Sequence, residues 1–139
     1  MVRQFAAPRM THPFEANFDH QLKLLGHTAP QIFETDGGQT LTLSLYWQAI
    51  TPAENLTRFV QLVGPAGTVY GQNDSVPDYG NYPTHLWQPG EVVSETVTIP
   101  VQADRPAGDY TLHIGLYRPD TGQRLRLVSG SDHVEIRVN

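Results

Sequence analysis

The chain has 139 residues, which is enough for one domain of ordinary size and too few for two. It contains no cysteine, so disulfides, zinc–thiolate sites and thiol nucleophiles are excluded. Its 14 acidic and 9 basic residues give a net charge of −5, which offers no basic field to hold nucleic acid or anionic lipid. No apolar run approaches the roughly 20 residues that span a bilayer, so we expect no direct membrane insertion.

The N-terminal quarter shows the weakest pattern. Residues 1–13 lack a hydrophobic period and hold two prolines, so we expect a loosely ordered lead-in there and a single domain over residues 14–139. Residues 21–25 predict an edge strand, because Gly26 and Pro30 leave little room for a helix.

The rest of the chain alternates apolar and polar residues, which is typical of strands with one buried face. This alternation covers residues 40–48, 93–101, 110–117 and 134–138, and Glu95 is the one polar residue at an otherwise apolar position. Leu125 and Leu127 form a shorter alternating stretch, which predicts another strand. Residues 59–63 and 68–70 flank Gly64-Pro65-Ala66-Gly67, which predicts a hairpin. About eight short strands separated by turn signals predict an all-β fold, an Ig-like antiparallel two-sheet β-sandwich.

The segment 71–91 has no strand period and is long for a loop in a compact domain; such loops are often functional. It combines aromatic rings, which can stack on the C–H faces of a sugar, with polar groups that can bond its hydroxyls. The candidate ligand-binding residues are Asp74, Asp78, Tyr79, Asn81, Tyr82 and Trp87. In the alternative interpretation Trp87 plugs the open end of the sandwich, with Tyr82 packed under it. Exposure of Trp87 to solvent distinguishes the two.

Residues that could perform catalysis or bind metal are scattered. None of the six histidines shows the i, i+4 or i, i+2 pairing that aims two imidazoles at one metal. His113 alternates with Leu112 and Ile114, which places it on the solvated side of its strand. The sequence contains no Gly-x-Ser-x-Gly and no phosphate-cradling glycine loop, and it singles out no pair of carboxylates. We therefore expect no metal, no cofactor and no enzymatic activity of the chain itself.

Several motifs occur in a familiar order: residues 41–49 (LTLSLYWQA), 59–62 (FVQL), 82–91 (YPTHLWQPGE), 106–110 (PAGDY) with 115–117 (GLY), and 121–125 (TGQRL). From about Phe18 onward the chain resembles the β-sandwich domain at the C-terminus of bacterial multi-pass membrane glycosyltransferases of the protein-mannosyltransferase-like class. The resemblance implies an extracytoplasmic accessory module, with any export signal elsewhere in a longer polypeptide. It carries no catalytic residue over, since the transferase chemistry of such proteins belongs to their membrane part.

The lack of a catalytic constellation predicts a non-catalytic accessory or interaction domain, and the resemblance implies that it is extracytoplasmic and part of a glycosyltransferase-like polypeptide. Its expected partners are a glycan or a cell-surface polypeptide. The alternative is a carbohydrate-binding module that uses the aromatic residues of the 71–91 loop. Fold alone does not decide between these functions.

Overall fold

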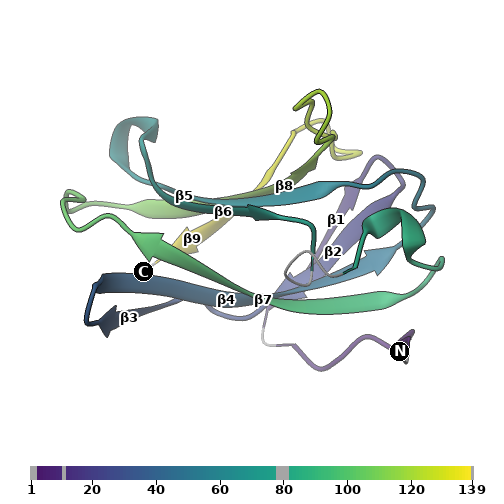
Figure 1. Ribbon diagram of the computed structural model, residues 1–139, viewed down its shortest axis with the longest axis horizontal. Coiled ribbons are helices and arrows are strands. Elements are labelled where there is room, and N and C mark those ends of the chain that lie inside the picture. Colours follow the sequence, from purple (N-terminus) through teal and green to yellow (C-terminus); the bar gives the residue numbers. More distant parts are fainter. Residues whose placement is uncertain (1–2, 11, 78–81, 139) are drawn as a thin grey trace.

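The computed structural model describes residues 3–10, 12–77 and 82–138, and its strands form two antiparallel sheets that pack face to face (Figure 1). The first sheet contains β1 (His12–Phe18), β2 (Leu22–His27), β3 (Gln31–Thr35), β4 (Gly38–Ala49) and β7 (Val92–Val101). The second contains β5 (Thr57–Val63), β6 (Val69–Ser75), β8 (Tyr110–Tyr117) and β9 (Val134–Val138). Two short 3-10 turns complete the elements, η1 (Pro65–Gly67) and η2 (Thr84–Leu86). The predicted all-β two-sheet sandwich is confirmed.

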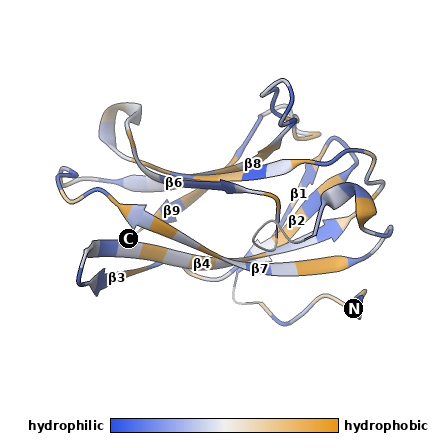
Figure 2. Cartoon of the chain, in the orientation of Figure 1, coloured by the Kyte–Doolittle hydropathy of each residue, from blue (hydrophilic) through white to orange (hydrophobic). Residues whose placement is uncertain are grey.

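The alternating residues of β4 show why the sheets pack. From Leu41 to Ala49 every second side chain points into the core and is at most 2% exposed. These inward residues are Leu41, Leu43, Leu45, Trp47 and Ala49. In Figure 2 the strands β4 and β7 accordingly alternate orange with paler residues along their length. Burying a large apolar side chain contributes about 1.5–3 kcal/mol, so this strand and its partner β7 anchor the core.

The other edge of β4 pairs with two strands in succession. β2 pairs with residues 45–49 and β3 with residues 38–42, and the chain leaves the ladder between them at Ala29 and Pro30. Proline has no N–H to donate, so it suits this interruption. β2 also pairs with β1, which makes it an inner strand, and the expectation of an edge strand over residues 21–25 is therefore wrong.

The strand at that edge is β1, which begins at His12 inside the stretch expected to be a lead-in. Only Ala16 and Phe18 are buried on it, so the segment carries no alternation that sequence inspection could detect. The short strand expected at Leu125 and Leu127 is also wrong. Of these two residues, Leu127 forms a single isolated bridge with Phe18, and Leu125 is buried without belonging to a strand.

The predicted hairpin between β5 and β6 is confirmed by their antiparallel register. Ala66 and Gly67 both take positive φ values, 65° and 80°, which the turn requires. β6 continues to Ser75, so the first five residues of the segment 71–91 belong to a strand and not to a loop. At Gly71 a Cβ would lie 2.6 Å from the Pro100 carbonyl oxygen, and glycine thus lets β6 approach β7 where the two sheets meet.

Glu95, the one polar residue at an inward position of β7, belongs to a buried ion pair that connects the two sheets. Arg58 on β5 donates from Nε to both carboxylate oxygens of Glu95, at 3.0 and 3.1 Å. Trp47 on β4 donates its indole N–H to the same carboxylate at 2.8 Å. The guanidinium also donates to the backbone and side-chain oxygens of Asn73 at 2.7 and 3.0 Å. The charges are therefore paired with each other inside the core and hold one sheet against the other.

Residues 106–110 form a second structural device. The Tyr110 hydroxyl donates to the Pro106 carbonyl four residues earlier, and the Arg105 guanidinium lies 5.0 Å from the centre of the tyrosine ring. A tyrosine at the start of a strand that bonds back to the preceding backbone is typical of Ig-like sandwiches, where it is called a tyrosine corner. The motif at residues 106–110 therefore stabilises the turn that precedes β8.

Candidate functional site

Three of the six candidate residues of the 71–91 segment fall within the described structure. They are Asp74, Tyr82 and Trp87, whereas Asp78, Tyr79 and Asn81 lie outside the described residues. The three described residues do not converge on one surface.

Trp87 and Tyr82 are buried, at 3% and 8% exposed. Their rings pack with centroids 5.8 Å apart, and the Trp87 indole N–H donates to the Tyr82 carbonyl at 3.0 Å. The Tyr82 hydroxyl donates to the buried Glu91 carboxylate, with 2.9 Å to each oxygen. Neither ring offers a free face to a sugar, so these two aromatic residues act as a plug of the sandwich and not as a stacking platform.

Glu91 is the centre of this plug. Its carboxylate also accepts the backbone N–H of Gln88 at 2.9 Å and lies 3.2 Å from the Arg3 guanidinium. Burial, together with the neighbouring Glu91 carboxylate, raises the pKa of the Tyr82 hydroxyl above its usual value of 10.0. The Tyr82 hydroxyl therefore stays protonated and serves as a hydrogen-bond donor within the fold.

Asp74 lies on the outer face of the second sheet. It is exposed, sits opposite Phe59 in the β5–β6 register, and accepts a hydrogen bond from the Tyr117 hydroxyl at 3.0 Å. Burial, followed by the Asp74 carboxylate, raises the pKa of Tyr117 above 10.0. The pair lines a shallow depression of about 240 Å³ beside Arg124.

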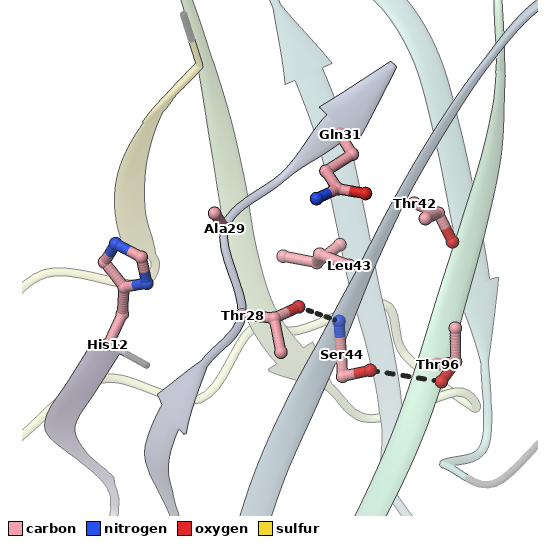
Figure 3. A pocket seen from close by; sticks show the side chains of 8 residues that line it. All are labelled: His12, Thr28, Ala29, Gln31, Thr42, Leu43, Ser44 and Thr96. Carbon is pink, nitrogen blue, oxygen red and sulfur yellow. Dashed lines mark hydrogen bonds between the residues drawn. The ribbon is translucent and has the colours of Figure 1, made fainter. Parts of the chain in front are cut away.

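A larger hollow of about 400 Å³ lies at the break between β2 and β3 (Figure 3). Its polar side chains come from β1, β3, β4, β7 and the β2–β3 connection. They are His12, Thr28, Gln31, Thr42, Ser44 and Thr96, with Ala29 and Leu43 as the apolar part of the lining. Sequence reasoning missed this site, because its residues meet only once β2 and β3 have both paired with β4.

Hydrogen bonds fix the lining of the hollow. The Ser44 backbone N–H donates to the Thr28 hydroxyl oxygen at 2.8 Å, while the Thr28 N–H donates to the Ser44 carbonyl at 3.0 Å. The Ser44 and Thr96 hydroxyls form a hydrogen bond of 3.1 Å, which is drawn as a dashed line in Figure 3. By contrast, Gln31 is exposed and its amide has no hydrogen-bond partner among the described residues. The site thus combines a rigid hydroxyl wall with one amide that can bond a ligand.

The side chains that line the hollow indicate which class of ligand it can bind. No carboxylate, lysine or arginine side chain is among the described residues that line it. Its hydroxyls and the Gln31 amide are neutral donors and acceptors that lie beside small apolar surfaces, and this combination suits an uncharged, hydroxyl-rich ligand.

A group of potential metal ligands lies elsewhere, on the outer face of the second sheet. One ligand atom each of His113, His133 and Glu135 lies within 4.8 Å of the other two. The predicted outward orientation of His113 is confirmed by its register opposite the exposed Glu135. The group was not predicted because its two histidines lie far apart in the sequence. The spacing of His133 and Glu135, two residues apart, was the available signal, since it puts both side chains on one face.

Among the described residues, no helix has the length and apolar character needed to cross a membrane. Comparison with known proteins gives no match to a family model, to a curated protein or to a solved structure.

Proposed function

We propose that the chain is a non-catalytic accessory module of an extracytoplasmic, glycosyltransferase-like polypeptide, and that it binds a neutral glycan at the hollow between β2 and β3. The observation that carries the proposal is a group of hydroxyls around the exposed amide of Gln31, with no carboxylate, lysine or arginine among the described lining residues. Sugar hydroxyls are both donors and acceptors, and such a lining can bond them without desolvating a charge.

The buried ionisable residues support the non-catalytic part of the proposal. Arg58 and Glu95 neutralise each other between the sheets, and Glu91 accepts hydrogen bonds from Tyr82 and the Gln88 backbone. Each of these groups has its partner within the fold, so their burial is explained by packing and needs no substrate. The resemblance of the sequence to an accessory domain of membrane glycosyltransferases supports the extracytoplasmic part.

The test is a screen on an array of neutral glycans, followed by calorimetric titration of the best binder. Gln31→Ala removes the free amide and is expected to weaken binding roughly 3- to 10-fold, the effect of one lost hydrogen bond. Ala29→Trp places a large ring at an exposed position of the lining and is expected to abolish binding. Gln72→Ala is the matched control, since Gln72 is an exposed glutamine on β6 of the other sheet.

Two results would overturn the proposed function. One is the absence of saturable binding across the neutral glycans of the array. The other is binding that survives Ala29→Trp unchanged, which would move the ligand away from this hollow.

A further inference from the structure

The histidine and carboxylate group on β8 and β9 is separate from the proposed glycan site. His113 lies on β8 directly opposite Glu135 on β9, and His133 precedes β9 by one residue. The His113 and His133 rings stack with centroids 4.3 Å apart and an interplanar angle of 18°. Two imidazoles and one carboxylate therefore share one patch of the sheet surface.

The distances are close to those of a metal site. Ligand atoms bound about 2.0–2.1 Å from a tetrahedral zinc lie about 3.3 Å from each other. His113 Nε2 and Glu135 Oε1 are already 3.2 Å apart. The three ligand atoms lie within 4.8 Å of one another, and metal binding requires the two stacked rings to rotate so that one nitrogen lone pair of each points at the same ion.

Asp132 positions the third ligand. Its carboxylate lies 2.8 Å from His133 Nδ1, which leaves Nε2 of the same ring as the nitrogen available to a metal. A carboxylate that holds the far nitrogen of a ligating histidine is the common supporting contact in zinc sites, where it fixes the tautomer and raises ligand basicity. Asp132 thus has the place of a positioning residue.

The surrounding charge permits a cation. Arg124 is the nearby positive group, and it is held by Asp132 at 3.4 Å and by the Phe59 ring, 4.1 Å from its centre. Asp132 and Glu135 supply two carboxylates, and Arg137, which follows Glu135 on the outward face of β9, is exposed and can extend into solvent.

We propose that His113, His133 and Glu135 form a surface site for a divalent transition metal of the zinc class, with Asp132 orienting His133. Two imidazoles and one carboxylate suit zinc and its neighbours in the first transition row. Calcium and magnesium prefer a shell of oxygen ligands, so the site discriminates against them. With three protein ligands, a fourth position stays open to water or to a group from a partner.

The test is calorimetric titration of tag-free protein with zinc chloride, together with the thermal midpoint of unfolding with and without zinc. We expect one zinc ion per chain and a midpoint that rises with zinc, since a ligand that binds the folded state stabilises it. Calcium chloride at the same concentration is expected to leave the midpoint unchanged.

Substitutions show whether zinc binds at this site or at other histidines of the chain. His113→Gln and the more exposed Glu135→Gln are each expected to weaken zinc binding by more than about tenfold, and Asp132→Asn by about tenfold. Glu135→Gln keeps the test valid should His113→Gln fail to fold, because the Glu135 side chain is 61% exposed. His85→Gln, at an exposed histidine on η2, is the matched control and is expected to bind zinc as the parent does.

The proposal is overturned if zinc produces neither a heat of binding nor a shift in the midpoint. It is equally overturned if Glu135→Gln binds zinc as tightly as the parent, if His85→Gln loses binding to the same extent, or if calcium gives the same shift. Loss of glycan binding would not change these outcomes, because the two sites share no residue.

Discussion

The ion pair between Arg58 and Glu95 makes the most demanding prediction about the core. Both side chains are 1% exposed, so removing one leaves the other charged and buried without its partner. Arg58→Met keeps much of the side-chain volume and removes the guanidinium. The Glu95 carboxylate then retains the Trp47 indole as its one described side-chain donor.

The expected cost follows from that uncompensated charge. Breaking a buried pair by removing one partner costs about 3–5 kcal/mol, and we expect this loss of unfolding free energy for Arg58→Met. Glu95→Gln leaves Arg58 without a counter-charge and is expected to cost a similar amount. The double variant carries no unpaired charge, and the glutamine oxygen can still accept from Trp47. It should therefore be more stable than either single variant, at a cost of about 1–2 kcal/mol relative to the parent.

The assay is urea unfolding of the parent and the three variants, followed by tryptophan fluorescence and circular dichroism, with equal m-values as the condition for comparison. Arg126→Met is the control, since Arg126 is exposed and should shift the free energy of unfolding by no more than about 0.5 kcal/mol. Additive costs in the double variant, or a cost below about 1 kcal/mol for Arg58→Met, would refute the argument that the pair is desolvated and coupled.

Three further predictions concern the buried Trp87, the packing of Gly115 against Phe59, and the pH dependence of stability. Trp87→Ala should lower the free energy of unfolding by about 3–5 kcal/mol in urea titrations, whereas truncation of the exposed neighbour Leu86 should have little effect. Gly115→Ala would put a Cβ 2.5 Å from the Phe59 ring and should cost about 1–3 kcal/mol in the same assay; a parent-like value would contradict the packing. Burial lowers the pKa of His27 below 6.5, so the unfolded chain takes up this proton first and stability should fall as the pH drops through 6.5. His27→Gln should flatten that part of the stability–pH curve, and an unchanged slope would assign it to other groups.

Most of the fold could be predicted because β4, β7, β8 and β9 bury one face each, and that burial leaves an alternating pattern in the sequence. The alternating pattern is missing where only one end of a strand is buried. β1 buries only its last residues, so its sequence did not indicate a strand, and β2 consequently resembled an edge. The error at β2 arises because a strand without a buried face is recognised only from its partner.

The candidate site was harder to predict. The aromatic and acidic composition of residues 71–91 is equally typical of a binding loop and of a plug, and only the burial of Trp87 and Tyr82 distinguishes them. The hollow beside Gln31 arises from two strands that share one edge of β4, which no local pattern encodes.

The metal-ligand group shows how the core can hold a surface site in place. His113 faces outward because Leu112 and Ile114 face inward, and a slip of one residue in register would exchange these faces. The burial that makes such a slip costly therefore also fixes His113 opposite Glu135. Two of the three proposed ligands are thus positioned by a hydrogen-bonded ladder before any metal binds, so binding needs to order side chains and not backbone.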